Sequence, residues 1–217
     1  MKLQEITYRD IADWLESVSS LIFNERDMQM QLSVFLRQTG HYDDVDLEYS
    51  LPNAAFNDYP WDSELRLDIV VRKGNEYLPI ELKYKTKSVS RRIERFGEML
   101  DVDFQIVKNH GAQDLGKYDF WKDVKRLEVV NRKFKSVVGG IAVFMTNDMA
   151  YTKPGRPDSN HIRFDMTEGL NTRQKHWLHE AKITKNYPDF DVDREYDIHW
   201  ESRIIDGETF YYTMVEL

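Results

Sequence analysis

The chain has 217 residues, of which 41% are hydrophobic and none is cysteine, and its 38 acidic and 30 basic residues give a net charge of -8 at pH 7. The lack of cysteine excludes disulfides, thiolate metal sites and a cysteine nucleophile, and it fits a reducing compartment. No segment approaches the roughly 20 apolar residues of a membrane helix, and the start of the sequence lacks the basic-then-apolar order of a secretory signal. We therefore expect a cytoplasmic protein with no membrane partner, folded as one domain over residues 1–217.

The first half of the chain predicts helices followed by strands. Apolar residues recur at helical spacing over Arg9–Ile22 and over Glu25–Gln38, where Asn24 is the expected N-cap and Gly40 the stop. Alternating residues then predict three strands, the last two joined by RKGNE as a hairpin: Asp46–Leu51, Leu65–Arg72 and Glu76–Lys85.

The second half adds three predicted helices, over Ser90–Leu100, Lys117–Phe134 and Thr167–Ile183. The apolar run Val137–Thr146 predicts a strand covered on both faces, and Asp197–Val215 predicts a terminal hairpin that turns at Asp206 and Gly207. This order indicates an α/β or α+β fold in which helices flank a mixed central sheet.

An acid and a base interrupt the apolar strand LPIELKYKTK. Glu81 and Lys83 are two residues apart, so they share one face of the strand at a spacing of roughly 6.7 Å. In the preceding strand, Asp68 lies on the face away from Leu67, Ile69 and Val71. Pairing of the two strands therefore gathers Asp68, Glu81 and Lys83 on one face.

Two carboxylates beside an ammonium group suit metal-assisted hydrolysis. Carboxylate oxygens are ligands for a hard cation such as Mg²⁺ or Mn²⁺, which keeps several waters. The Lys83 side chain would orient or deprotonate one of those waters, or stabilise charge on a phosphoryl oxygen. We expect a phosphodiester substrate.

RLDIVV followed after a short turn by LPIELKYKT resembles the core of the PD-(D/E)XK nuclease superfamily, the restriction-endonuclease-like fold. Asp68 matches the aspartate of that motif, Glu81 its second acid and Lys83 its lysine, whereas Leu67 stands where the motif has proline. The resemblance implies an α-β-β-β-α-β core over about residues 24–146. Residues 147–217 lie outside it and are expected to form a C-terminal helix and hairpin extension. The resemblance also implies an endonuclease or exonuclease that requires a divalent metal and cuts DNA, or alternatively RNA.

Two further acids are candidates for the same site. Glu25 begins the second helix on the stripe of Met28, Leu32 and Leu36, so it is either an additional metal ligand or an acid that stabilises the helix N-terminus. Glu48 in the first strand is either another ligand or a solvated residue. The segment KHWLHE superficially resembles a metal cluster, but it lacks a third ligand at the usual spacing and is expected to be a solvated helix face.

Basic residues are concentrated between positions 83 and 135, where 14 basic and 8 acidic residues give a local net charge of +6. This asymmetry predicts one surface for a polyanion on an otherwise acidic protein, with a solvated basic helix as the alternative. The expected nucleic-acid contacts are Lys85, Lys87, Arg91, Arg92, Arg95, Lys122 and Arg126.

Two other classes of function stay open. A nuclease fold can bind nucleic acid or a protein partner without cutting, and a homodimer is compatible with the sequence. Alternatively, the protein is an acidic interaction module in which Asp68, Glu81 and Lys83 form a salt-bridge ladder on a solvated sheet face.

Overall fold

A six-stranded mixed sheet runs through the centre of the computed structural model, which describes residues 2–56, 58–180 and 183–217. Neighbouring strands are antiparallel except for β3 and β8, which run parallel. In spatial order the strands are β1 (Asp44–Leu51), β2 (Leu65–Lys73), β3 (Glu76–Tyr84), β8 (Ile141–Thr146), β14 (Glu208–Glu216) and β13 (Glu201–Ile205). The mixed α/β class predicted from the sequence is therefore confirmed.

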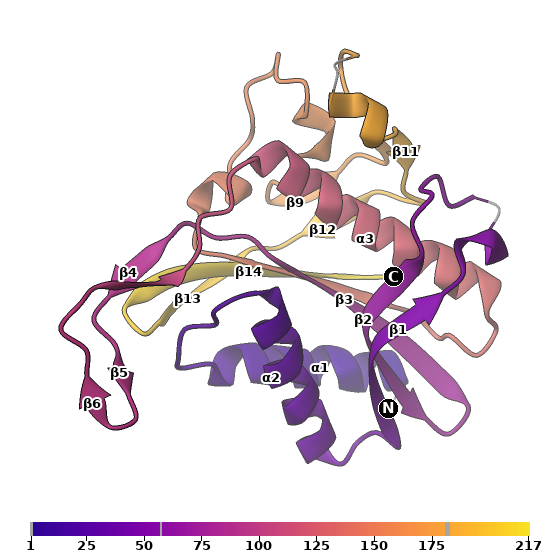
Figure 1. The fold of residues 1–217 in the computed structure, drawn as a ribbon. Coiled ribbons are helices and arrows are strands. Elements are labelled where there is room, and N and C mark those ends of the chain that lie inside the picture. Colours follow the sequence, from indigo (N-terminus) through magenta and orange to yellow (C-terminus); the bar gives the residue numbers. More distant parts are fainter. Residues whose placement is uncertain (1, 57, 181–182) are drawn as a thin grey trace.

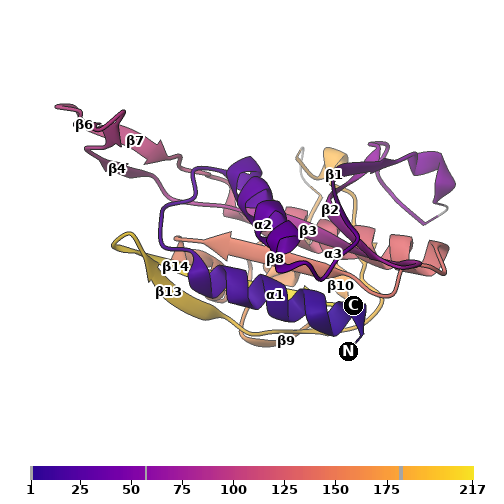
Figure 2. The same cartoon turned by 90° about the horizontal axis from the view of Figure 1, so that it is seen from below.

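Helices cover both faces of this sheet (Figures 1 and 2). One face packs against α1 (Leu3–Ser17) and α2 (Glu25–Thr39), and the other packs against α3 (Gln113–Lys133). The first helix begins and ends several residues earlier than predicted, and it ends where the chain becomes extended at Val18. Among the described helices, none has both the length and the apolar character needed to cross a membrane.

The ends of α2 follow the predicted caps. The Asn24 side chain accepts a hydrogen bond from Asp27 N at 2.9 Å, and Gly40 ends the helix with a φ of 70°. The caps place Glu25 in the first turn, where it meets the C-terminal end of β3.

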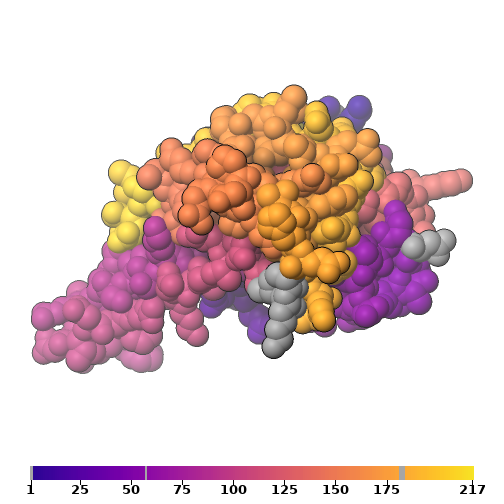
Figure 3. Space-filling view, turned by 90° about the horizontal axis from the view of Figure 1, so that it is seen from above, coloured from indigo at the N-terminus to yellow at the C-terminus, as the bar shows by residue number. Residues whose placement is uncertain are grey.

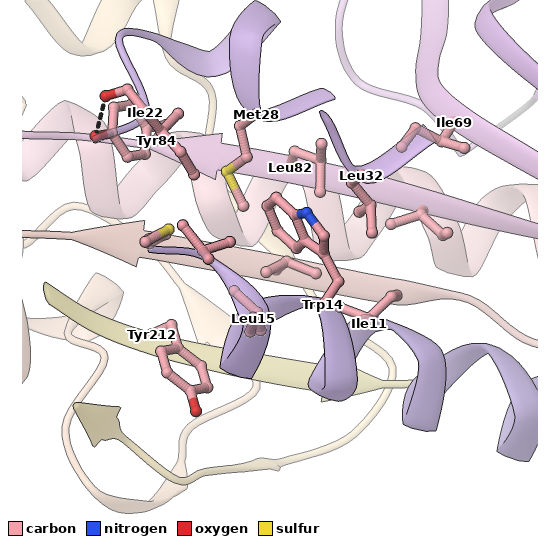
Figure 4. Close-up of a cluster of buried hydrophobic side chains, with 14 of the residues drawn as sticks. Ile11, Trp14, Leu15, Ile22, Met28, Leu32, Ile69, Leu82, Tyr84 and Tyr212 are labelled. Carbon is pink, nitrogen blue, oxygen red and sulfur yellow. Dashed lines mark hydrogen bonds between the residues drawn. The ribbon is translucent and has the colours of Figure 1, made fainter. Parts of the chain in front are cut away.

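Each sheet face buries its own apolar cluster. Beneath α1 and α2, Trp14 and Met28 meet Leu82 of β3, and the Tyr84 hydroxyl donates a hydrogen bond to Ile22 O at 2.7 Å (Figure 4). Because β8 lies between both clusters, all six of its residues are buried, as its continuous apolar run predicts.

The predicted helix Ser90–Leu100 is wrong. This segment and the residues after it form a two-stranded arm, residues 89–107, which projects from the body of the protein (Figure 2). Phe96 and Gly97 turn the chain at the tip with φ values of 55° and 83°, which ends any helix there. The arm comprises β4 (Val89–Arg91), β5 (Glu94–Arg95), β6 (Glu98–Met99) and β7 (Phe104–Val107).

The predicted helix Thr167–Ile183 is also wrong, and residues 181 and 182 lie outside the described part of the chain. The Asn171 side chain donates hydrogen bonds to Thr167 O and Gly169 O, so it stabilises a turn in place of a helix. Short strands follow: β9 (Gly169–Asn171), β10 (Gln174–Lys175), β11 (Phe190–Asp191) and β12 (Tyr196–Ile198). Four 3-10 helices are described, at Asn53–Ala55, Met149–Thr152, Ile162–Phe164 and Ile183–Asn186.

The terminal hairpin is confirmed. β13 and β14 join at Asp206 and Gly207, whose φ values of 49° and 80° suit a two-residue turn with two positive φ angles. β14 then pairs with β8, so the last part of the chain completes the central sheet.

Candidate functional site

Asp68 and Glu81 lie where β2 and β3 part. The backbone register of these strands ends at the pair Ile69 and Ile80, and Asp68 and Glu81 are the next residues along the two strands. Leu82 N donates a hydrogen bond to Asp68 Oδ2 at 2.7 Å, in place of a bond to a backbone carbonyl of β2. The Asp68 side chain therefore links the parting strands and is fixed next to Glu81.

Glu48 interrupts the pairing of β1 with β2 at the same level. Its φ of 53° lies in the left-handed region, which costs a residue other than glycine about 1–3 kcal/mol and persists only where the surrounding structure holds it. Gln29 Nε2 donates to Glu48 Oε1 at 3.1 Å and to Asp68 O at 2.7 Å. The α2 helix thus holds the irregular backbone in place through Gln29.

The prediction that Leu67, Ile69 and Val71 share one face is wrong. Ile69 and Val71 belong to the apolar cluster beneath α1 and α2, but Leu67 belongs to the cluster beneath α3. The alternation along β2 breaks at Asp68, where regular pairing with both neighbouring strands is lost.

The carboxyl groups of Asp68 and Glu81 are buried with few cations near enough to stabilise their negative charge. Burial, followed by the neighbouring charge of Asp123, raises the pKa of Asp68 to about 6. Glu81 is 2% exposed, and burial together with the charges of Asp123 and Asp68 raises its pKa well above the usual value. Its Oε1 atom has no hydrogen-bond partner among the described residues, and the closest cation is Arg126 Nη1 at 3.6 Å.

Lys83 is held between two acids from different helices. Its Nζ lies 3.0 Å from Asp123 Oδ2 and 3.7 Å from Glu25 Oε1. Burial disfavours the charge on Lys83, but the Asp123 and Glu25 carboxylates outweigh burial and raise the pKa of the ammonium above its usual value. Lys83 is therefore a cation at neutral pH, which suits charge stabilisation better than proton abstraction.

Glu25 lies at the edge of the site. Its side chain is 41% exposed, and its Oε2 accepts a hydrogen bond from Tyr84 N at 2.9 Å. The carboxylate therefore caps the end of β3 and faces Lys83, and it does not point into the apolar core with the other residues of its helical stripe.

Asp123 and Arg126 of α3 complete the charge cluster, and Asp123 was not predicted. Asp123 is 2% exposed, and its Oδ1 lies 3.1 Å from Arg126 Nη1. The sequence does indicate that Asp123 is buried. It is three residues after Phe120 and four before Leu127, which are both fully buried on the same helix face. A carboxylate on such a stripe needs a partner.

A polar cavity of about 350 Å³ opens beside this cluster. The motif carboxyl of Asp68 lies in its wall, and the other lining residues are Asn24, Glu25, Arg26, Gln29, Glu48, Tyr84, Lys85 and His110. Glu81 is buried and does not line the cavity. Sequence reasoning missed Arg26, Gln29 and His110.

His110 closes the base of the arm next to the cavity. Its Nδ1 accepts from Thr86 N at 3.1 Å, and His110 N donates to Thr86 O at 2.6 Å. Burial and the charge of Lys85 lower the pKa of the imidazole, so His110 is neutral at pH 7 with its proton on Nε2.

The structure places the seven predicted nucleic-acid contacts in different surroundings. Four of the seven form ion pairs: Lys85 with Asp119, Lys87 with Asp148, Arg91 with Asp206 and Glu208, and Arg126 with Glu81 and Asp123. Lys122 Nζ lies 4.9 Å from the centre of the Trp61 ring, and Arg92 and Arg95 are exposed on the arm. Only Lys85 among these seven lines the cavity.

The KHWLHE segment is not helical. His176 Nε2 lies 2.8 Å from Asp191 Oδ1 across the short β10–β11 pair. His179 N donates to Asn160 Oδ1. The two histidines therefore engage different parts of the chain.

The donor chemistry at Asp68 and Glu81 fits a divalent cation, although no set of three or more His, Cys, Asp or Glu side chains among the described residues is arranged as a metal site. Mg²⁺ commonly takes only one or two carboxylates, because waters and substrate phosphates complete its coordination. Glu81 Oε1 accepts no hydrogen bond from the described residues, and burial together with neighbouring acids raises the pKa of both carboxyls, so a cation bound beside them would be stabilised.

Comparison with protein-family models, with curated proteins and with solved structures finds no match for this chain. The functional argument therefore depends on the chemistry of the site.

Proposed function

We propose that this protein is a nuclease of the PD-(D/E)XK type, which hydrolyses phosphodiester bonds in DNA with the aid of Mg²⁺ or Mn²⁺. The observation that carries the proposal is the juxtaposition of Asp68 and Glu81 at the parting of β2 and β3, with Lys83 two residues further along the strand. The order α2, β1, β2, β3, α3, β8, with β8 parallel to β3, supports it, because that order agrees with the α-β-β-β-α-β core of the resembling family.

The metal would be held by Asp68 and Glu81, with Glu25 and Glu48 as further oxygen donors at the cavity. When bound there, a divalent cation supplies the Lewis acidity that phosphodiester hydrolysis needs. A cation also offsets the mutual repulsion of the two buried carboxyls, which offers a physical reason for keeping them together.

Lys83 would stabilise negative charge on the phosphoryl group in the transition state. Glu25 and Asp123 hold its ammonium from two sides, so the group is positioned before substrate arrives. Arg126 would have a supporting role, because it sits behind the site between Glu81 and Asp123.

Substrate phosphate would enter through the cavity. Arg26 and Lys85 line it, and Arg26 is exposed and makes no ion pair with another described residue. These two side chains would bind the DNA backbone without reading its sequence.

One alternative retains specific support. Asp123 already neutralises Lys83, and Arg126 lies near Glu81, so the same cluster would serve a nuclease-fold protein that binds nucleic acid without cutting. A solvated salt-bridge ladder has less support, because Glu81 is buried and Lys83 pairs with Glu25 and Asp123 rather than with Asp68 or Glu81.

The test is incubation of purified protein with linear, circular, branched and single-stranded DNA and with RNA, each with Mg²⁺, Mn²⁺ or a chelator. We expect cleavage that requires the metal and is lost in Asp68→Asn and Glu81→Gln. Glu76→Gln, a change at the exposed start of the same strand, is the matched control and should cut normally. Binding of DNA by the parent protein without cleavage under any metal condition would favour the non-cutting alternative.

A further inference from the structure

The arm, residues 89–107, is an extended hairpin that projects from the body of the protein (Figures 2 and 3). Its inner half is anchored by ion pairs, whereas its outer half touches the body at Arg95, whose guanidinium lies 5.9 Å from the centre of the Phe23 ring. Arg91 fixes the inner half, because its guanidinium donates to Asp206 O at 2.8 Å and pairs with Glu208 at 3.2 Å. The outer half, β5 and β6, is two-stranded and pairs with no third strand in the described chain. An isolated two-stranded hairpin is at best marginally stable in water, and its open edges favour association.

Apolar side chains are concentrated on this outer half. Phe96 at the tip is completely exposed, and its φ of 55° is unfavourable for a bulky residue in a turn that usually takes asparagine or glycine. Four more large apolar residues are exposed on the return strand and its approach: Met99, Leu100, Val102 and Phe104. An apolar surface of this kind on a projecting element indicates a binding site.

The charges of the outer half indicate which partner it suits. Residues 92–104 contain two arginines and four acids, a net charge of -2, and none of these six side chains forms an ion pair with another described residue. The net negative charge disfavours a polyanion such as DNA. The outgoing strand carries Arg92, Glu94 and Arg95, a net charge of +1, whereas the return strand carries Glu98, Asp101 and Asp103, a net charge of -3. The outgoing strand of one arm is therefore complementary in charge to the return strand of a second copy.

We propose that residues 92–104 form a dimerisation surface whose partner is the same arm of a second copy of this chain. The exposed apolar residues bury one another, and the arginines of one arm pair with the aspartates of the other. Each arm also covers the other's open strands. The proposal does not depend on the nuclease activity.

The first test is the oligomeric state of the full-length protein, measured by sedimentation velocity across a range of concentrations. We expect the parent to dimerise and Phe96→Ser to raise the dissociation constant by about tenfold or more, because aromatic anchors dominate such interfaces. Phe96 is fully exposed in the single chain, so the change should leave the thermal unfolding of the monomer unaltered. Ile204→Ser, which removes an apolar residue of 71% exposure from β13, is the matched control and should still dimerise.

A charge swap tests the pairing itself. Arg92→Glu with Arg95→Glu makes every charge of the outer half negative, so this variant should be monomeric. Mixing it with the variant Asp101→Arg with Asp103→Arg should restore a dimer that contains one chain of each type.

Three results would overturn the proposal. One is a parent that stays monomeric at all concentrations, and another is a dimer that Phe96→Ser and the arginine reversals leave unchanged. The third is a monomeric parent in which the arginine reversals abolish binding of duplex DNA, which would make the arm a nucleic-acid contact.

Discussion

Removing the charge of Asp68 should stabilise the metal-free protein at neutral pH. The carboxyl is largely buried, has no cation within ion-pair distance among the described residues, and its pKa rises from 3.8 to about 6 in the folded state. A carboxyl whose folded pKa is raised contributes stability fully below pH 3.8, and that contribution is lost as the pH rises through about 6. The rise corresponds to roughly 3 kcal/mol at about 1.36 kcal/mol per pH unit.

Asp68→Asn isolates this effect, because an asparagine oxygen can still accept the hydrogen bond from Leu82 N. We expect the variant to match the parent near pH 4 and to exceed its free energy of unfolding by up to about 3 kcal/mol at pH 7.5. Urea unfolding in chelator, followed by fluorescence of the five tryptophans, measures the difference at each pH. Glu76→Gln serves as the control, and its difference from the parent should not vary with pH.

Added Mg²⁺ should reverse the order of stability. At a concentration one hundred times its dissociation constant, the metal should stabilise the parent by about 2.7 kcal/mol, and Asp68→Asn much less. Two results would refute the reasoning about the Asp68 charge. One is that Asp68→Asn is less stable than the parent at pH 7.5 in chelator. The other is that the difference in their free energies of unfolding is the same at every pH.

The other predictions concern neighbouring side chains. Lys83→Met should lower the single-turnover cleavage rate by about 10²–10⁴ with unchanged DNA affinity, and a loss of affinity alone would make Lys83 a phosphate contact. Asp123→Asn should destabilise the protein by about 3 kcal/mol in urea unfolding, because Lys83 and Arg126 lose their shortest ion pairs and keep only the longer ones with Glu25 and Glu81, and a stabilised variant would contradict this. Glu25→Gln should raise the Mg²⁺ concentration needed for half-maximal cleavage at unchanged stability, and an unaltered titration would limit Glu25 to capping β3. Arg26→Gln should weaken DNA binding across unrelated sequences and reduce the log-log salt slope by about 0.9, whereas an unchanged slope would exclude a phosphate contact.

Local patterns predicted the central strands and the caps of α2. The β2–β3 hairpin depends on alternation and a short turn, and the burial of β8 depends on an uninterrupted apolar run. The Asn24 cap and the Gly40 stop are equally local. These features need no knowledge of distant contacts, because the chain close to each residue determines them.

The apolar spacing in the arm led to the wrong prediction of a helix. Ile93, Phe96 and Leu100 are three and four residues apart, as in an amphipathic helix, but Phe96 and Leu100 are exposed in the structure. The spacing of apolar residues predicts a buried stripe only where another element is available to cover it. No other described element covers the tip of the arm, so that condition is not met there.

The candidate site was predictable only in its strand residues. The neighbouring places of Asp68 and Glu81 follow from the hairpin register, which the sequence indicates. Asp123 and Arg126 reach the same cluster because α3 crosses the sheet above β3, and no local pattern determines which turn of the helix lies there. The break in alternation at Asp68 coincides with the positive φ of Glu48 on the neighbouring strand, and no local sequence pattern indicates either feature.

The most direct test of the metal site is a titration of Mn²⁺ against the protein, with free Mn²⁺ followed by electron paramagnetic resonance in the presence of a DNA oligonucleotide. We predict that the parent and Glu76→Gln deplete free Mn²⁺, whereas Asp68→Asn and Glu81→Gln bind it at least tenfold more weakly. Equal depletion by all four proteins, or none by the parent, would contradict the claim that Asp68 and Glu81 together hold a divalent cation.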